Sequence, residues 1–234
     1  MIKTTSFING SKSDNAERLE LIINATGVGI WDWQVQTGEL TFNQRWAEII
    51  GYTVAELKPM TFDTWANRVH PDDLPNAQQL LNKHWQGELD LYEVELRMRH
   101  KRGHYVWVLA SGKVVEWEGS GKPKRMLGSH LDITERKTRE GERIIANQLL
   151  QESQKIAKVG GWELNLDTGL LYWTAETYRI HETSPEEFDP SVDAGVDYFL
   201  PDSREQISLA LDQAINQGIG YDLELETLTT KGRK

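Results

Sequence analysis

The sequence predicts an α+β fold that occurs twice along the chain. First, the same residues recur at an offset of 131 positions: Trp31 matches Trp162, and Thr37-Gly38 matches Thr168-Gly169. Second, the first copy opens with strand-like residues and continues with short helical stretches. Third, residues 92–98 alternate apolar and charged side chains, as a strand with one buried face does. So long an offset indicates a duplicated domain, because solenoid repeats span only about 20–50 residues.

Composition narrows the class of protein. A chain of 234 residues suffices for two domains, each of about 110 residues and able to bury its own core. The net charge of −10 disfavours a general nucleic-acid surface or contact with an anionic membrane. The chain has no cysteine, which excludes disulfides, thiolate catalysis, Cys-bound zinc and cysteinyl-flavin photochemistry. No stretch resembles a membrane span or a signal peptide, so we expect a soluble, cytoplasmic chain.

The N-terminal region is predicted to hold a tail and one helix. Residues 1–13 show no period and are predicted to be a flexible tail. An amphipathic helix is predicted over residues 14–26, with Asp14 as N-cap and Glu17 completing a capping box. Gly27 ends it. Its apolar residues follow at helical spacing: Leu19, Ile22 and Ile23.

The first copy, over residues 27–136, alternates strand and helix signals. Thr37-Gly38 marks a hairpin between two strands. The longest helix is predicted to begin at His70-Pro71-Asp72-Asp73, with an Asp as N-cap, and to end at Gly87. We predict strands at 28–35, 40–42, 92–98, 105–117 and 125–133, and short helical elements at 44–50, 55–57 and 62–69.

Three motifs give this region a family resemblance. They are Gly51-Tyr52-x-x-x-Glu56-Leu57, then His70-Pro71-Asp72-Asp73, then Leu131-Asp132-Ile133-Thr134-Glu135-Arg136-Lys137. In this order, over residues 25–137, they resemble a PAS domain, more narrowly the Trp-rich subtype of bacterial sensor proteins. The resemblance implies a five-stranded antiparallel sheet with short helices on one face.

The second copy, over residues 158–234, resembles the first half of the same family. It keeps Pro201-Asp202 but has Leu200 where the first copy has His70. At an offset of 131, Glu224-x-Glu226 is predicted to match Glu93-x-Glu95. The family's last two strands would follow the turn near Lys231, so this copy is predicted to lack them. We expect a fragment of a longer protein, with a helical linker at 137–157 between the copies.

An aromatic set is the candidate ligand cleft. The resemblance implies a cleft between sheet and helices that holds flavin, heme or a small metabolite in other members. Packing is the favoured alternative, because large rings fill a small core and leave less room for a flavin. We therefore expect no flavin or heme, and leave a colourless metabolite open. The set is Trp31, Trp33, Phe42, Trp46, Trp65, Trp85 and Trp107.

The histidines and carboxylates do not predict catalysis or a metal site. Heme-binding relatives place their ligand on the long helix, where residues 76–79 contain no histidine. His70 is predicted to fix its turn, and His84 lies near a helix C-terminus, where a protonated ring would favour the dipole. Asp72-Asp73 is predicted to be a cap, and Glu93 and Glu95 to face solvent. No nucleophile, phosphate loop or paired acid and base stands out.

Asp132-Ile133-Thr134 is the candidate signal relay. The motif ends the last strand and leads into a helix predicted from Glu135 to about Ala157. Thr134 is predicted to cap that helix and Asp132 to pair with a basic residue of the domain. The resemblance implies coupling between the core and the outgoing helix, and an ordinary cap is the alternative. A partial coiled-coil seam follows, formed by Ile145, Leu149 and Ile156 and flanked by Ile144 and Leu150.

The favoured function is therefore signal input. Tandem PAS modules would relay a signal to a C-terminal output, with a histidine kinase favoured on frequency and a diguanylate cyclase as the alternative. The second class is a ligand-free module for dimerisation and protein interaction. An enzyme in its own right is disfavoured, since no reactive constellation is present. We expect a homodimer formed through the flanking helices.

Overall fold

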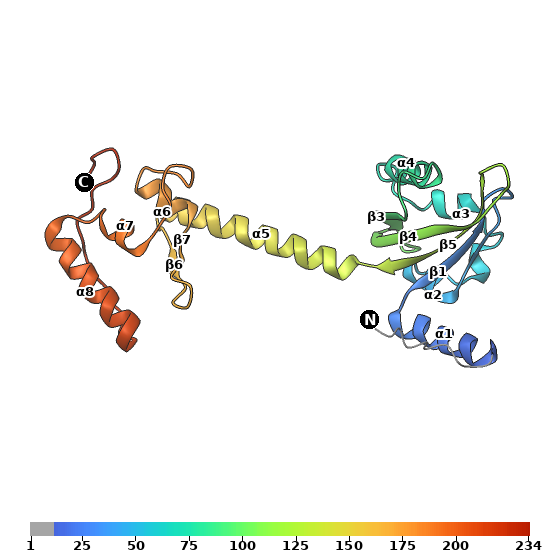
Figure 1. Cartoon of the computed structure of the whole chain (residues 1–234), viewed down its shortest axis with the longest axis horizontal. Helices are drawn as coiled ribbons and strands as arrows, with labels where there is room; N and C mark the ends of the chain where they lie inside the picture. The colour runs from blue at the N-terminus through green and yellow to red at the C-terminus, as the bar shows by residue number, and fades with distance from the viewer. Residues whose placement is uncertain (1–11) are drawn as a thin grey trace, which may run out of the picture. The chain divides into compact units, whose positions relative to one another are not determined.

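A five-stranded antiparallel sheet forms the centre of the first unit (Figure 1). Every strand predicted from alternation is present, with ends displaced by at most two residues. On β3 the apolar side chains are buried and the charged ones are exposed or half-buried, which fixes the register. The sheet order is β2 (Leu40–Phe42), β1 (Gly29–Gln34), β5 (Pro123–Asp132), β4 (Tyr105–Trp117) and β3 (Tyr92–Arg99).

The computed structural model describes residues 12–234, which divide into two compact units with the boundary between Glu140 and Gly141. Helix α1 (Lys12–Thr26) begins two residues earlier than predicted. Asp14 therefore lies inside the first turn, and its prediction as N-cap is wrong. The rest of the predicted tail lies outside the described residues. Gly27 ends the helix in the left-handed conformation, with φ of +66°.

Short helices supply the other half of the first core. Their buried side chains join those of one sheet face in a single apolar cluster. Asn43 caps α2, because its side chain accepts the Trp46 N–H. The helices are α2 (Gln44–Ile49), the 3₁₀ turn η1 (Ala55–Leu57), α3 (Phe62–Ala66) and α4 (Leu74–Trp85). This arrangement is the predicted α+β fold.

Trp31 lies on β1, which pairs with β2 on one side and β5 on the other. Its indole is 6% exposed. A Cβ atom added at Gly112 or Gly128 would come within 2.4 or 2.2 Å of the ring. Two glycines on neighbouring strands therefore leave the space that this indole fills.

The second unit consists of a small sheet and C-terminal helices. Helix α5 (Thr134–Ala157) leads into the second unit, whose sheet has two antiparallel strands. The elements are β6 (Trp162–Leu164), β7 (Leu171–Trp173), α6 (Ala175–Ile180), α7 (Val192–Val196) and α8 (Pro201–Gln217).

The end of the second unit differs from the predicted alignment. Leu200 N–H donates to the Glu226 carbonyl, as His70 N–H donates to the Arg97 carbonyl in the first unit. By this hydrogen bond Glu226 corresponds to Arg97, at an offset of 129. The predicted match of Glu224-x-Glu226 with Glu93-x-Glu95, at an offset of 131, is therefore wrong by two residues. The cause is a shorter connection after the left-handed Gly218 that ends α8.

Replacing Trp31 by alanine should lower the free energy of unfolding of the first unit by about 3–5 kcal/mol. Two contributions add up to this loss: the free energy gained by burying the indole is lost, and a cavity is left beside Gly112 and Gly128. Chemical denaturation followed by circular dichroism measures it. Trp117→Ala is the matched control, because Trp117 is 46% exposed. A loss under about 1 kcal/mol for Trp31→Ala would contradict the packing described here.

Candidate functional site

An aromatic cavity of about 30 Å³ lies between the sheet and the helices of the first unit. Five of the seven predicted aromatic residues line it: Trp31, Trp33, Phe42, Trp46 and Trp65. The other lining residues, which the sequence did not indicate, are Leu40, Phe62, Leu81, Tyr92 and His130. These come from β2, α3, α4, β3 and β5, so they meet only in the folded domain.

Two residues of the predicted set lie elsewhere. Trp85, at the end of α4, packs against Trp33 with ring centroids 5.7 Å apart, outside the cavity lining. Trp107 lies on the opposite face of the sheet. On β4 the alternation buries Val106 and Val108 against the helices and turns Trp107 away from them.

The cavity wall carries buried hydrogen-bond donors without acceptors. The indole N–H groups of Trp31, Trp33 and Trp46 and the hydroxyl of Tyr92 have no partner among the described residues. Each unpartnered buried donor costs about 1–3 kcal/mol. An acceptor placed in the cavity would remove part of that cost. A volume of about 30 Å³ admits one or two waters or a very small ligand, far less than the roughly 300 Å³ at which ligand pockets begin.

His130 is the titratable residue of the cavity. It is 4% exposed, and its ring lies 5.3 Å from that of Trp46. Burial lowers the pKa of His130 from 6.5 to about 3, so the ring is neutral at pH 7. Strand phase was the signal that could have found it, since Met126, Gly128 and His130 alternate on β5.

His84 and His70 have structural contacts. His84 joins α4 to β4: its Nδ1 lies 2.7 Å from the Leu89 carbonyl, and its Nε2 accepts the Val114 N–H at 3.1 Å. His70 Nδ1 accepts the Asp72 N–H at 3.2 Å, within its own turn. Among residues 12–234 no group of three or more His, Asp or Glu side chains could hold a metal ion.

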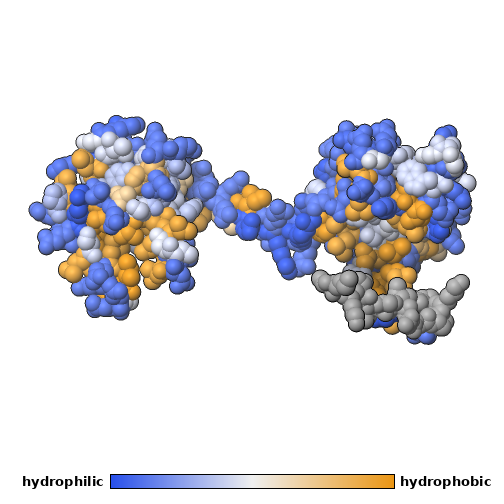
Figure 2. Space-filling model, viewed as in Figure 1, coloured by the Kyte–Doolittle hydropathy of each residue, from blue (hydrophilic) through white to orange (hydrophobic). Residues whose placement is uncertain are grey.

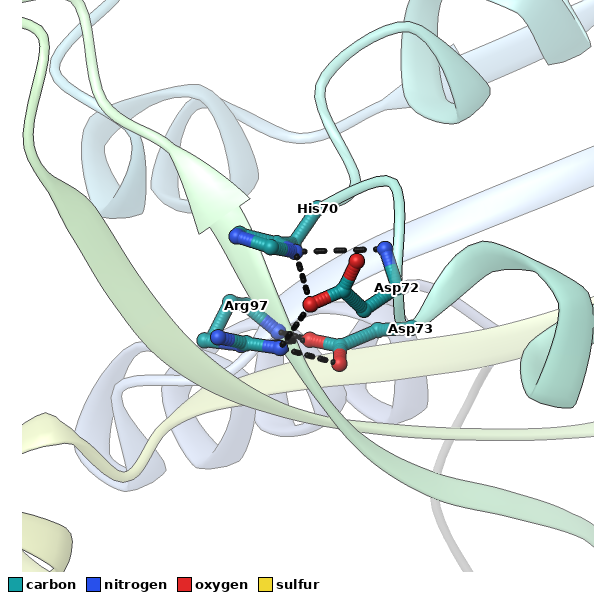
Figure 3. A network of polar contacts seen from close by, with 4 residues as sticks. All are labelled: His70, Asp72, Asp73 and Arg97. Carbon is teal, nitrogen blue, oxygen red and sulfur yellow. Dashed lines mark hydrogen bonds and ion pairs between the residues drawn. The ribbon is translucent and has the colours of Figure 1, made fainter.

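An ion-pair network lies at the N-terminus of α4 (Figure 3). Asp73 occupies the N-cap position, but its carboxylate makes no cap hydrogen bond, so the predicted side-chain cap is wrong. The carboxylate instead accepts from Arg97, from the backbone N–H at 2.8 Å and from the guanidinium at 2.9 and 2.7 Å. These hydrogen bonds lower the pKa of Asp73. Asp72 lies 3.7 Å from His70 and 3.8 Å from Arg97.

At the start of α5 two predictions are wrong: Thr134 does not cap the helix with its side chain, and Asp132 does not pair with a basic residue of the described chain. Asp132 Oδ1 accepts the Thr134 N–H at 2.9 Å, a local turn, and no ion pair to a basic residue is present among the described residues. Thr134 Oγ1 accepts the Trp107 N–H at 3.0 Å, so its hydroxyl binds the sheet. Between them Ile133 is buried, and its N–H donates to the Trp107 carbonyl at 2.9 Å.

Glu95 on β3 is a further contact of this helix. It was predicted to face solvent, but it is half-buried and accepts from Lys137 Nζ at 2.6 Å and from Arg136. These two hydrogen bonds, that of Lys137 first, lower the pKa of Glu95. The sequence could not indicate the contact, because it joins side chains 41 and 42 positions apart.

The comparisons with known proteins agree with this geometry. Residues 39–130 match the family model described as PAS fold. The crystal structure of a sensory box histidine kinase/response regulator from Burkholderia thailandensis E264 is 30% identical, with a TM-score of 0.51, and the match covers 58% of this chain and 98% of that one. The first unit is a PAS domain. It is homologous to regions of sensor histidine kinases and diguanylate cyclases.

Two curated relatives of this PAS domain protein are much longer. The probable diguanylate cyclase DgcE of Escherichia coli (strain K12) is 25% identical over 228 residues, which are 95% of this chain and 20% of the relative. The blue-light-activated histidine kinase of Brucella anthropi is 26% identical over 137 residues, which are 58% of this chain and 26% of the relative. The chain thus spans about a fifth to a quarter of their length. Within residues 12–234 no helix is long and apolar enough to cross a membrane.

The stability of the PAS domain should fall as the pH drops from about 6.5 toward 3. Between these values His130 binds a proton in the unfolded chain but not in the folded one, which gives a slope of up to about 1.4 kcal/mol per pH unit. Urea denaturation at several pH values measures the slope. His130→Leu should flatten it, and His104→Leu, in the exposed β3–β4 turn, should not. Equal slopes in wild type and His130→Leu would contradict the assignment.

Proposed function

We propose that the chain is a sensory input region, in which the state of the PAS core is relayed through α5 to an output in the parent protein. The supporting observation is a short covalent path. His130 lines the cavity, and three residues later Ile133, which directly precedes α5, is buried. A change that moves the central strand β5 therefore moves the first residues of α5 directly.

We further propose that the second unit is a second PAS copy, with residues 137–157 as linker and residues 158–234 as the domain. β7 and α6 repeat β2 and α2 at an offset of 131. The Gly161 N–H donates to the Thr174 side chain, as the Ile30 N–H does to Asn43. A pocket of about 110 Å³ in this unit is lined in part by the counterparts, at an offset of 131, of the first cavity's residues, namely Trp162, Leu164, Leu171, Trp173, Thr177 and Val196.

The proposed output is a histidine kinase or a diguanylate cyclase. Frequency within the family favours the kinase. The alignment that extends over both units, 95% of the chain, is to a probable diguanylate cyclase and favours the cyclase. Sequencing the parent gene downstream of Lys234 distinguishes them.

A small hydrogen-bond acceptor, such as a carboxylate, is the ligand class that the unpartnered donors of the cavity support. Millimolar formate or acetate should raise the thermal midpoint of the chain and slow or speed amide exchange at residues 134–141. Tyr92→Phe, which removes one donor, should weaken the effect. Tyr172→Phe, at a tyrosine that is 65% exposed, should not. If neither anion changes the midpoint or the exchange, the ligand proposal fails.

A ligand-free dimerisation module is the second candidate function. The small cavity supports it, and so do exposed apolar side chains of α5, called here the stripe residues, of which Figure 2 shows a small patch. No residue of α5 is buried, from Thr134 to Ala157. The stripe residues are 51–81% exposed and comprise Ile144, Ile145, Leu149, Leu150 and Ile156. We propose that a second copy of the chain covers them, with Leu19 and Ile22 of α1 as further apolar contacts.

Self-association should therefore depend on Leu149. Leu149→Asp should shift sedimentation toward monomer, with the dimer dissociation constant raised at least about tenfold, because a charge would be buried in an apolar seam. Asn147→Asp is the matched control, since residue 147 lies on the other side of the helix by the 3.6-residue period. A chain that stays monomeric at several hundred micromolar, with or without Leu149→Asp, would contradict the dimer.

A further inference from the structure

Five side chains join the N-terminus of α4 to the first turn of α5 across the sheet face opposite the helices. They are Asp73, Arg97, Trp107, Lys137 and Glu95, called here the Trp107 cluster. We propose that this cluster is a positioning device that holds α5 on the sheet and transmits displacement of α4 to it. The inference rests on the proposed relay function and adds a second route to the covalent path through β5.

Trp107 is the central residue of the cluster. Its backbone carbonyl accepts the Ile133 N–H at 2.9 Å, and its N–H donates to Thr134 Oγ1 at 3.0 Å. The carbonyl and the N–H of Trp107 therefore both bind the segment where the chain leaves the sheet.

The indole ring of Trp107 contacts two cations. The Arg97 guanidinium carbon lies 5.5 Å and the Lys137 ammonium 5.2 Å from the ring centroid, both within cation–π range. Two like charges on one ring are tolerable only because each has its own carboxylate. Asp73 pairs with Arg97 at 2.7 Å, and Glu95 pairs with Lys137 at 2.6 Å.

Partial burial makes these pairs stronger than ordinary surface pairs. The side chains of Asp73, Arg97, Lys137 and Glu95 are 18–34% exposed. Screening by salt and water is weaker there than at a free surface. Loss of one carboxylate would leave its cation to reorient over the indole and would disturb the other pair. The cluster therefore behaves as one unit and not as two separate ion pairs.

The cluster also reaches the cavity through α4. Leu81, on this helix, lines the cavity, and Asp73 is the residue at its N-cap. A helix of this length moves as a rigid element, so a shift at Leu81 displaces Asp73. Because no residue of α5 is buried between Thr134 and Ala157, its contacts with the sheet at its first turn decide its direction.

Hydrogen–deuterium exchange of the full chain tests the proposal without any ligand. The amides of Thr138–Gly141 are followed in wild type, Asp73→Asn, Glu95→Gln and the double variant. Asp73→Asn should accelerate their exchange at least about threefold, although among the described residues the Asp73 carboxylate forms hydrogen bonds only with Arg97 and none with α5. Glu95→Gln should have a similar or larger effect. The exchange rate in the double variant should exceed that in Glu95→Gln by less than about twofold, because the first substitution already disrupts the whole cluster.

The controls keep charge and position matched. Glu93→Gln removes a carboxylate from the same strand and face, where the only side-chain contact among the described residues is to Ser111. Asp63→Asn removes one from the first turn of α3. Both should leave exchange at Thr138–Gly141 within twofold of wild type. Arg97→Lys is a second variant that keeps the charge but loses the two-pronged contact, and it should accelerate exchange as Asp73→Asn does.

Two results would overturn the proposal. In the first, Asp73→Asn and Arg97→Lys change the exchange rate at Thr138–Gly141 by less than twofold. The thermal midpoint must show that both variants are folded. The other is a double variant whose acceleration equals the product of the single effects. The exchange experiment uses no ligand, so its outcome does not depend on the outcome of the formate and acetate test of the proposed function. The two proposals can therefore fail separately.

Discussion

The close approach of the Trp31 indole to Gly112 and Gly128 is the constraint on which the first unit depends. It requires glycine at both positions, on β4 and β5, because any side chain there would overlap the ring. It also directs Trp31 toward the helices, where it forms one wall of the cavity. Strand pairing, core packing and the shape of the cavity therefore share one contact. The residues on the other sheet face, Trp107 among them, take their positions from the register that this contact fixes.

The fold was largely predictable, because it follows from local patterns. Alternation on β3 and β4, the Thr37-Gly38 hairpin and the glycines that end helices each act over a few residues. The candidate site was predictable only in part. Five aromatic residues of the cavity were identified from their type, but Trp107 has the same type and lies on the other face. Residue type alone could not distinguish them, whereas strand phase could.

Two of the errors at the site involve partners distant in sequence. Asp73 is an acceptable N-cap residue, yet its carboxylate bonds to Arg97, which is 24 positions away. Glu95 would be exposed on an isolated strand and is half-covered only because α5 begins above it. A charge-assisted pair to arginine is stronger than a cap hydrogen bond to a backbone N–H. At Asp73 and Glu95, tertiary contacts therefore outweigh the local preferences from which the predictions were made.

The tryptophan-rich core also gives the protein an optical reporter of its own. The chain has nine tryptophans, and four of them line the first cavity. Emission from indoles in such dry surroundings lies at shorter wavelength than emission from indoles in water. His130 beside them is neutral when folded, and a protonated imidazole is the stronger quencher of indole fluorescence. Opening of this core, by heat, acid or a bound molecule, is therefore visible in the intrinsic fluorescence, with no label attached.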